Sequence, residues 1–346
     1  MGKIGLLTIH DTLNYGSLLQ TYALYKAIES LGKDIELIDY KCKAIVDRET
    51  TYSLKDCRSV KDVVKSLMWH GAMQRKYDNF WNFMQKNMKL TETYTKESIK
   101  KANDIFDTFV VGSDIVWGTG ITGKDWTYFL DFAEDNKKKI AFSSSVGTKW
   151  ENEDREKVIK YLQRFDAISV REELAQQWIK DMGIDVQVTC DPTMLWGSDF
   201  WENMITTLRS NEEPYVLVYM WTKDMRTLNH AKEYAKNHGL RVKCQQFYNP
   251  IKGVENVKPV TLEEWISLIA NAQTVFTASY HGLLYSLYFH KDVYYYNREN
   301  KSRMESLGQE LNISHREISK EFSERAIIDY DYVDQKLEEK RNYSLQ

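Results

Sequence analysis

The sequence predicts an α/β protein made of two Rossmann-like domains that face a central cleft. The first observation is length, because 346 residues exceed one typical domain and suit two. The second is a repeated alternation of apolar, strand-like runs with segments of helical periodicity. The third is that this alternation stops at a turn near residue 192 and starts again in the second half.

We assign residues 1–195 to the N-terminal domain. It begins with an apolar strand over 3–10, a loop over 11–16 and a helix over 17–31 that Gly32 ends. Together with a strand over 35–39, these segments form a βαβ unit. Further buried strands are expected at 104–112, 139–145 and 167–171. The turn at Asp191-Pro192-Thr193 precedes the domain border, because the residue before proline leaves the helical region.

The second domain, 196–325, repeats this logic. We expect strands at 215–220, 240–246, 274–278 and 293–296, and helices at 225–238, 262–272, from about Gly282, and at 302–311. The charged tail at 326–346 is predicted to form a surface helix.

Composition excludes several classes of protein. The net charge of −3 and pI of about 6.2 disfavour a general nucleic-acid binder, which is usually basic. The four scattered cysteines match neither a zinc site nor a disulfide framework. The N-terminus has no signal-peptide core, and no apolar run reaches 18 residues. We therefore expect a cytoplasmic protein.

The segment Thr277-Ala278-Ser279-Tyr280-His281-Gly282 passes from a predicted strand into a predicted helix. The first turn of such a helix offers N–H groups and a positive dipole end, which suit phosphate or carboxylate. Ser279 can cap the helix or bind the ligand, Gly282 allows close backbone approach, and His281 can titrate near neutral pH. The alternative is a capped helix start with a hydrogen-bonded histidine.

Four segments resemble the polysaccharide pyruvyl transferase family, and the resemblance runs from about residue 3 to about residue 311. The segments are TIHDTLNYGSLLQ at 8–20, VGSDIVW at 111–117, ISVREE at 168–173 and SYHG at 279–282. The resemblance implies a GT-B-like fold. It also implies transfer of a pyruvyl group from phosphoenolpyruvate to two hydroxyls of a sugar in a cell-surface or exopolysaccharide precursor, giving a cyclic ketal.

The resemblance places Asp114, Arg171 and His281 in the cleft as catalytic residues, with Ser113, next to Asp114, as a substrate-binding residue. Arg171 would grip the carboxylate or phosphate of the donor. His281 would protonate the methylene carbon, and Asp114 would accept a hydroxyl proton or position the sugar. Alternatively, Arg171 only pairs with the neighbouring glutamates and Asp114 only caps a turn. No metal or other cofactor is implied.

The chain departs from the family at Ser279, where some relatives carry Arg two residues before the His. Another cation must then hold the donor, and Arg298, Lys301 and Arg303 are the candidates. In the first domain, the loop at Asn14, Tyr15 and Gly16 would contact acceptor or donor. Alternatively, Gly16 only serves the strand-to-helix turn.

Residues 59–90 are helical, rich in Met and aromatic residues, and more basic than acidic. A basic amphipathic helix can lie on a membrane surface, which would suit a lipid-linked oligosaccharide acceptor and a place at the inner face of the membrane. The alternative is ordinary packing.

Two rival functions use the same fold. One is a nucleotide-sugar glycosyltransferase, which a nucleoside diphosphate should stabilise. The other is a non-catalytic binding protein in polysaccharide assembly, which the absent arginine at position 279 favours.

Overall fold

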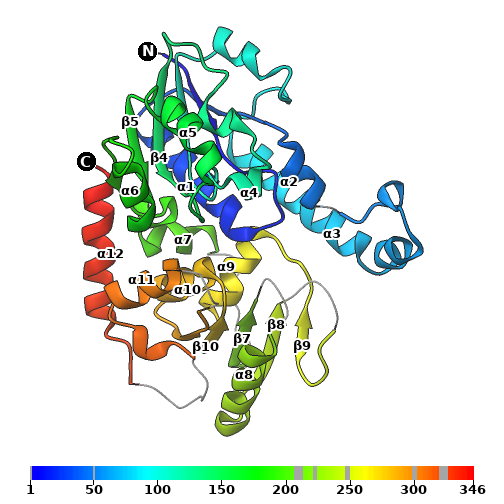
Figure 1. Cartoon of the computed structure of the whole chain (residues 1–346). Helices are drawn as coiled ribbons and strands as arrows, with labels where there is room; N and C mark the ends of the chain where they lie inside the picture. Colours follow the sequence, from blue (N-terminus) through cyan, green and yellow to red (C-terminus); the bar gives the residue numbers. More distant parts are fainter. Residues whose placement is uncertain are drawn as a thin grey trace. The chain divides into compact units, whose positions relative to one another are not determined.

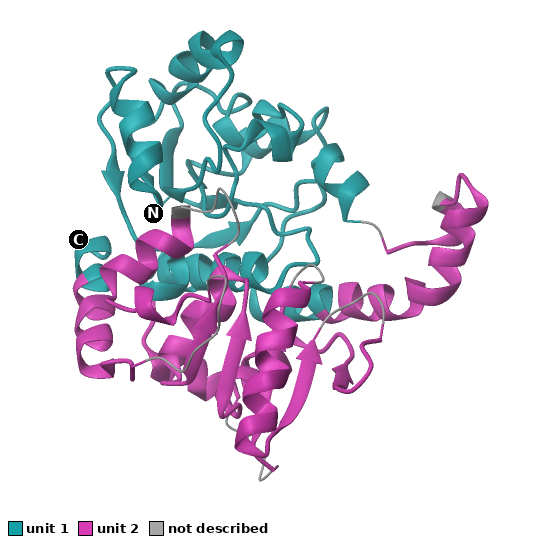
Figure 2. Cartoon of the chain, turned by 60° about the horizontal axis from the view of Figure 1, so that its bottom comes forward, with its two compact units in different colours: residues 1–50, 80–195, 340–346 teal, residues 51–79, 196–339 magenta. Residues whose placement is uncertain are grey.

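The computed structural model describes residues 2–49, 51–205, 213–220, 224–245, 250–297, 302–318 and 326–346. Contacts divide the chain into two compact units (Figure 2). Unit 1 contains residues 1–50, 80–195 and 340–346, and unit 2 contains residues 51–79 and 196–339. The predicted division shares the border at 195/196. It differs in three segments, because 51–79 and 326–339 group with unit 2 and 340–346 groups with unit 1.

Unit 1 is built on a six-stranded parallel sheet in the order β2-β1-β3-β4-β5-β6 (Figure 1). The strands are β1 (Ile4–Leu7), β2 (Ile35–Leu37), β3 (Thr108–Val111), β4 (Lys138–Ser144), β5 (Ala167–Val170) and β6 (Gln187–Val188). The helices are α1 (Tyr15–Ser30), α2 (Lys43–Arg48), α4 (Thr119–Thr122), α5 (Arg155–Leu162) and α6 (Glu173–Lys180). This alternation of parallel strands and helices is the predicted Rossmann-like pattern.

Unit 2 is built on a five-stranded parallel sheet in the order β11-β10-β7-β8-β9. The strands are β7 (Tyr215–Tyr219), β8 (Arg241–Gln245), β9 (Glu255–Val257), β10 (Thr274–Thr277) and β11 (Asp292–Tyr295). The helices are α7 (Ser198–Met204), α8 (Met225–His238), α9 (Leu262–Ala270), α10 (Tyr280–Tyr288) and α11 (Ser302–Glu310). All of β7 and β10 is buried, as expected for central strands covered on both faces.

Two helices each contain residues of both units, because the division between the units falls within them. They are α3 (Val60–Asn87) and α12 (Tyr330–Ser344). The second is the predicted C-terminal helix, and it buries only Val333 and Leu337 along its length. Within the part of the chain that the structure describes, no helix combines the length and the apolarity needed to cross a bilayer.

Capping side chains explain why two helices begin two residues before their predicted starts. Helix α1 begins at Tyr15 rather than residue 17, because Asn14 Oδ1 accepts hydrogen bonds from the Gly16 and Ser17 amides at 2.9 and 3.4 Å. Helix α10 begins at Tyr280 rather than Gly282, because Ser279 is the N-cap. The strand predicted at 104–112 is shorter, since Ile99–Asp104 forms a 3-10 helix.

Candidate functional site

The strand order of unit 1 reverses between β1 and β3, where the chain leaves β1 toward β2 and later returns to the other side. Ligands of open parallel sheets bind at the carboxyl ends of strands at such a reversal. Here the loop after β1 leads to Ser17 in α1, and the loop after β3 carries Asp114. The Ser17 hydroxyl donates a hydrogen bond to Asp114 Oδ2. The sequence-predicted Asp114 therefore lies at the reversal.

The turn that carries Asp114 depends on its own backbone geometry. Gly112 has φ of 137°, and a Cβ atom there would lie 2.0 Å from the Phe142 carbonyl oxygen. Only glycine fits this position. Asp114 has φ of 64°, a left-handed conformation that Asp adopts more readily than most residues. The Ser145 amide donates to the Asp114 carbonyl at 2.9 Å and so holds the turn against β4.

Ser113, predicted to bind substrate, is instead held by hydrogen bonds within unit 1. Its side chain has no exposed surface, and its hydroxyl donates to the Ser143 carbonyl at 2.7 Å. Its amide donates to Gln20 Oε1 at 3.1 Å, while Gln20 Nε2 donates to Thr8 Oγ1 at 3.1 Å. The buried Gln20 amide thus ties the β1 loop to the β3 loop.

Arg171, directly after β5, lies among three carboxylates. Its Nη1 is 2.6 Å from Asp191 Oδ2, its Nη2 is 3.9 Å from Asp114 Oδ1, and its Nε is 3.6 Å from Glu172 Oε1. The Asp191 side chain is fully buried and that of Arg171 is 3% exposed. One buried guanidinium therefore positions the carboxylates that follow β3, β5 and β6.

This arrangement changes the role predicted for Arg171. The guanidinium assigned to an anionic donor is instead paired with protein carboxylates, and Ser145 Oγ also donates to Glu172 Oε1. Three carboxylates against one guanidinium leave excess negative charge, which repels phosphate and carboxylate. Carboxylate oxygens accept hydrogen bonds from hydroxyls, so this edge of unit 1 suits a sugar.

The predicted loop residues lie in and before the first turn of α1. Asn14 uses its side-chain oxygen to cap the helix, and the Gly16 amide donates to that oxygen. Tyr15 has no exposed surface, and its ring packs edge-on against Phe80 with centroids 5.0 Å apart. In this conformation Tyr15 contributes to the core and cannot reach a ligand.

A buried ion cluster lies at the neighbouring ends of β1 and β2. His10 Nε2 is 3.0 Å from Asp39 Oδ1, and Thr93 Oγ1 donates to Asp39 Oδ2 at 2.6 Å. Lys41 Nζ lies 3.1 Å from Asp39 Oδ1 and 2.9 Å from Asp11 Oδ2. Burial alone would raise the pKa of Asp39, but the hydrogen bonds from His10 and Thr93 and the charge of Lys41 hold that pKa well below its usual range.

In unit 2 the strand order reverses between β7 and β10, and a helix begins after each of these strands. Asp224 caps α8 by accepting from the Arg226 amide at 3.0 Å. Ser279 caps α10 by accepting from the Gly282 amide at 3.3 Å. Two helix N-termini therefore meet the carboxyl edge at the reversal. The Asp224 carboxylate already lies at the N-terminus of α8, whereas that of α10 has a neutral serine cap and is favourable for an anion. The sequence-predicted Ser279, Tyr280, His281 and Gly282 all lie here.

Gly282 serves the packing of α10 on the sheet. A Cβ atom at this position would lie 2.5 Å from Thr277 Oγ1 and 2.8 Å from Tyr219 Cδ1. Thr277 Oγ1 in turn donates to the Tyr219 carbonyl at 2.9 Å. The glycine thus lets the helix approach β7 and β10 closely and fixes the position of its neighbour His281, which is 9% exposed.

Two arginines lie near this edge of unit 2. The Arg303 guanidinium is 5.9 Å from the ring centroid of Tyr280, and the Arg226 guanidinium is 4.8 Å from that of Tyr296. Arg303 was among the cations predicted from the sequence, whereas Arg226 was missed. Arg298 and Lys301 lie outside the described residues.

The residues missed by sequence reasoning share a position in the chain. Ser145 and Asp191 come directly after β4 and shortly after β6, and Ser17, Gln20 and Arg226 lie in the helices that follow β1 and β7. That position was a usable signal, because the loops after parallel strands meet at one edge of the sheet.

Comparison with protein-family models identifies the family. The model described as polysaccharide pyruvyl transferase matches residues 14–300, most of the chain. The protein belongs to the polysaccharide pyruvyl transferase family. This confirms the resemblance carried by the four sequence segments, and it makes the chain a member of a transferase family.

Solved structures that resemble this family member are very distant in sequence. One is a protein assigned as a UDP-N-acetylglucosamine 2-epimerase from Listeria monocytogenes, with 9% identity, coverage of 100% of this chain and 91% of that one, and a TM-score of 0.53. A UDP-N-acetylglucosamine 2-epimerase from Rickettsia bellii has 9% identity, coverage of 99% and 88%, and a TM-score of 0.50.

A third similar structure is an alpha-glucosyltransferase in complex with UDP and DNA, with 8% identity, coverage of 99% and 90%, and a TM-score of 0.51. These likenesses support the predicted GT-B-like fold and carry no information about substrate. No curated protein sequence matches the chain.

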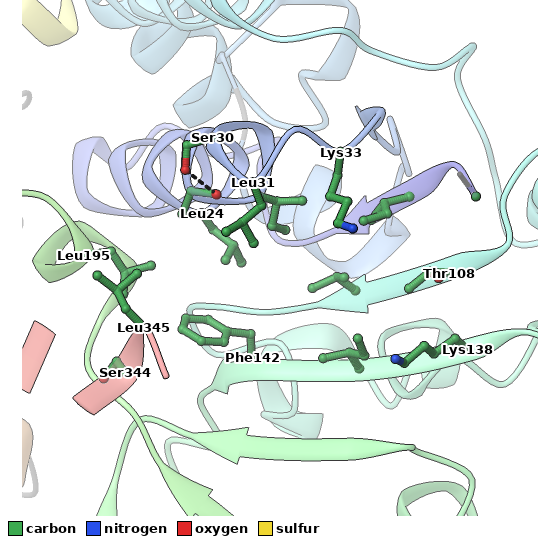
Figure 3. Close-up of a pocket in the computed structure, with 16 residues that line it drawn as sticks. Leu24, Ser30, Leu31, Lys33, Thr108, Lys138, Phe142, Leu195, Ser344 and Leu345 are labelled. Atoms are coloured by element: carbon green, nitrogen blue, oxygen red, sulfur yellow. Dashed lines mark hydrogen bonds between the residues drawn. The ribbon is translucent and has the colours of Figure 1, made fainter. Parts of the chain in front are cut away.

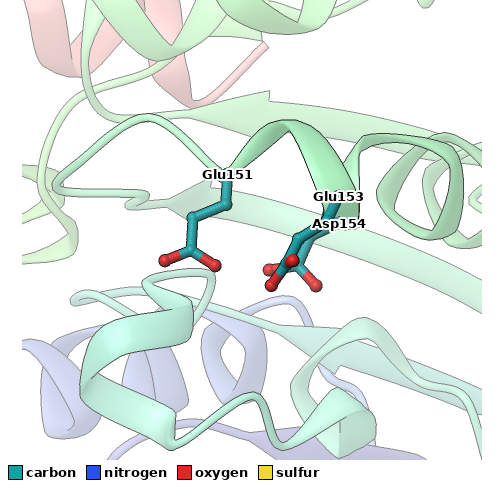
Figure 4. Close-up of side chains that lie close together, drawn as sticks. All are labelled: Glu151, Glu153 and Asp154. Carbon is teal, nitrogen blue, oxygen red and sulfur yellow. The ribbon is translucent and has the colours of Figure 1, made fainter.

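Unit 1 of this family member also contains a cluster of three carboxylates. The cluster does not belong to the loops after β1 and β3, where the strand order reverses. The carboxylates belong to Glu151, Glu153 and Asp154 (Figure 4), the one such group found among the described residues. Lys124 Nζ lies 2.7, 2.8 and 2.9 Å from their oxygens. The lysine ammonium supplies the positive charge that the cluster needs, so the cluster gives no reason to infer a metal.

Replacing Arg171 with methionine should destabilise unit 1. The change removes the guanidinium whose Nη1 lies 2.6 Å from the buried Asp191 Oδ2, and breaking a buried ion pair in this way costs about 3–5 kcal/mol. We expect that loss in the free energy of unfolding measured by chemical denaturation. The control is Arg155→Met, because Arg155 donates only to the Asp181 carbonyl near the surface. Equal stability of the two variants would contradict the structural role of Arg171.

Proposed function

We propose that this protein transfers a pyruvyl group from phosphoenolpyruvate to two hydroxyls of a sugar in a polysaccharide precursor, forming a cyclic ketal. Both sugar oxygens bond to the carbon that carried the phosphate, and phosphate leaves. One hydroxyl proton ends on the methylene carbon, which becomes a methyl group, and the other ends on phosphate. Family membership supports the reaction class, and the geometry of the two sheet edges supports the assignment of the substrates.

The donor is assigned to unit 2, and the observation that carries this proposal is the start of α10. There the capped helix N-terminus, His281 and the Arg303 guanidinium lie at the reversal between β7 and β10. Phosphoenolpyruvate carries a phosphate and a carboxylate, so two positive features are needed. The N-terminus of α10 and the two arginines provide them. His281 is proposed to deliver the proton to the methylene carbon.

The acceptor sugar is assigned to unit 1. Asp114 is 16% exposed at its side chain and is held by Ser17 and by the charge of Arg171. A fixed carboxylate beside a solvent-accessible edge can accept a proton from an attacking sugar hydroxyl. Glu172, which is 11% exposed at its side chain, can accept a hydrogen bond from a second hydroxyl. Arg171 acts through these carboxylates as a positioning residue.

A second candidate function is glycosyl transfer from a nucleotide sugar. Its support is the fold likeness to a glucosyltransferase bound to UDP, which is a property of fold and not of site. The two candidates differ in the ligand that stabilises the protein. Phosphoenolpyruvate should raise the melting temperature if the pyruvyl proposal holds, and UDP should do so under the alternative.

Catalysis can be tested by measuring phosphate release from phosphoenolpyruvate in the presence of candidate acceptor sugars. We expect sugar-dependent release, and His281→Ala should retain less than about a tenth of the rate, because a general acid typically contributes about 10²–10⁴-fold. The matched control is His238→Ala, since His238 lies at the end of α8 and its Nδ1 contacts the Tyr234 carbonyl.

If His281→Ala keeps most of the wild-type rate, the general-acid role is wrong. If wild type releases no phosphate with any sugar although phosphoenolpyruvate raises its melting temperature, the non-catalytic binding protein is the better description.

Donor recognition by the arginines can be tested separately from chemistry. We expect Arg303→Gln and Arg226→Gln each to raise KM for phosphoenolpyruvate about tenfold, since a hydrogen bond to a charged group contributes about 1.5–3 kcal/mol. The control is Arg241→Gln, because Arg241 lies at the opposite, amino end of β8 and pairs with Glu255. An unchanged KM in both test variants would remove the arginines from the donor site.

We further propose that the first turns of α3 contact a membrane surface, as a lipid-linked acceptor would require. The packing alternative describes the end of this helix, where Phe80, Phe83 and Met84 are buried. Its beginning differs. Five apolar side chains spaced three and four residues apart are exposed, namely Val60, Val63, Val64, Leu67 and Met68. Such spacing places them on one helix face.

Charge supports an anionic membrane as the partner of this apolar face. The exposed Lys61 and Lys65 lie on the helix flank beside it, and the exposed Arg58 precedes the helix. A helix with an apolar face and flanking basic residues lies in the plane of a membrane interface and prefers anionic lipid. Val60 and Leu67 expose 81% and 76% of their surface. A cluster of apolar side chains this exposed typically marks an interaction surface.

Membrane contact can be measured by sedimentation with lipid vesicles. Wild type should bind vesicles that contain phosphatidylglycerol more tightly than pure phosphatidylcholine vesicles, and added salt should weaken the binding. Val64→Ser/Leu67→Ser should reduce the binding at least about fivefold. Removing these apolar side chains should lose at least about 1 kcal/mol of the free energy gained when they leave water for the membrane. Leu174→Ser, at an exposed leucine of α6, is the control. Equal binding of all three proteins would contradict the proposal.

A further inference from the structure

An apolar groove lies along one face of the unit 1 sheet, and none of the residues that line it is assigned to either substrate. Its volume is about 490 Å³, and Figure 3 shows the lining side chains. The floor consists of Ile4 from β1, Val110 from β3, and Ile140 and Phe142 from β4. This volume is within the usual range for small-molecule sites, about 300–1,000 Å³.

The groove exists because this face of the sheet is only partly covered. Parallel sheets are normally covered on both faces, but here α1 covers one side and the chain end at Leu345 the other. Leu345 is anchored because Ser344 Oγ accepts from the Cys190 amide at 2.9 Å. Between these covers, Ile140 and Phe142 remain only half-buried. Filling the groove with an apolar ligand would remove this surface from water.

Polar side chains in the lining are few, and both serines among them are already bonded. The Ser30 hydroxyl donates to the Ala27 carbonyl at 2.8 Å, and Ser344 is engaged with Cys190. A sugar or a nucleotide needs several converging hydrogen-bond partners, so neither fits. No carboxylate is among the residues that line the groove.

Positive charge is confined to one end of the groove. Figure 3 shows Lys33 and Lys138 toward the end where Thr108 lies, and Phe142, Leu195 and Leu345 toward the other end. This agrees with the sequence, because Lys138 and Thr108 begin their strands and Lys33 precedes β2. Both lysines are exposed, and no ion pair is found for either among the described side chains.

We propose that this groove binds a single-chain anionic amphiphile. Its aliphatic chain would lie over Ile140 and Phe142, and its carboxylate or phosphate would lie between Lys33 and Lys138. A neutral chain would bind more weakly, because it makes no charge-assisted contact. The proposal does not depend on the pyruvyl transfer reaction and applies equally to an inactive chain.

The test uses the full chain and the fluorescent probe 1-anilinonaphthalene-8-sulfonate, with displacement of the probe as the readout. Palmitate and farnesyl phosphate represent the two sources of the ligand chemistry, a fatty acid and an isoprenoid phosphate. Hexadecanol is the neutral control. We expect at least one of the two anions to displace the probe with one-to-one stoichiometry, at least about tenfold more tightly than the alcohol. The tighter anion identifies the source.

Variants separate the groove from other apolar surface. Lys33→Glu/Lys138→Glu should weaken anion binding at least about tenfold and leave hexadecanol unchanged. Lys160→Glu/Lys180→Glu changes the charge equally on α5 and α6 and should have no effect. All four lysines are exposed, so the substitutions should not prevent folding. Ile140→Trp, which fills the groove, should weaken binding of all ligands.

Three results would overturn the proposal. The first is equal affinity for the anions and the alcohol. The second is equal anion binding by wild type and the Lys33→Glu/Lys138→Glu variant. The third is a stable dimer in sedimentation velocity that Ile140→Trp dissociates, because a second copy of the chain would then cover the groove.

Discussion

In each unit all paired strands run in the same direction, and this parallel pairing is the constraint on which the candidate sites depend. It brings every strand-to-helix loop to one edge of the sheet. In unit 1 it collects Asp114, Arg171 and Asp191 from loops after three different strands, although 77 residues separate the first from the last. In unit 2 it places two helix N-termini beside each other. Neither set of groups could be assembled by local structure alone.

The two edges differ in charge, and this difference determines which substrate each can hold. At the unit 1 edge one guanidinium is shared by three carboxylates, which favours hydroxyl groups. At the unit 2 edge, the N-terminus of α10 and nearby arginines favour anions. A net charge of −3 is therefore compatible with the highly charged donor that we propose, because recognition depends on the local field and not on the total charge.

Sequence reasoning succeeded where local chemistry determines structure. Apolar runs located the strands, and Ser279 indicated the start of α10 to within a few residues. It named the pairing of Arg171 with a neighbouring glutamate as an alternative but did not foresee Asp191, which lies 20 residues away and becomes a neighbour only through β5–β6 pairing. It also failed for Tyr15, since burial against Phe80 on α3 is a tertiary contact. Arg226 was missed because its contact with Tyr296, which directly follows β11, joins two segments that are 70 residues apart in the sequence.

The burial of Arg171 also bears on how this chain compensates for the arginine that some relatives carry at position 279. Ser279 here uses its hydroxyl to cap α10, so it adds no positive charge of its own. Arg171 cannot supply the missing charge, because its guanidinium is already committed to Asp191. The charge must then come from other helices of unit 2, and Arg303 on α11 is held above the ring of Tyr280, next to the cap. Under the proposed donor assignment, the cation therefore lies on α11, beside the site, and not on the helix that begins the site, while the helix N-terminus itself is retained.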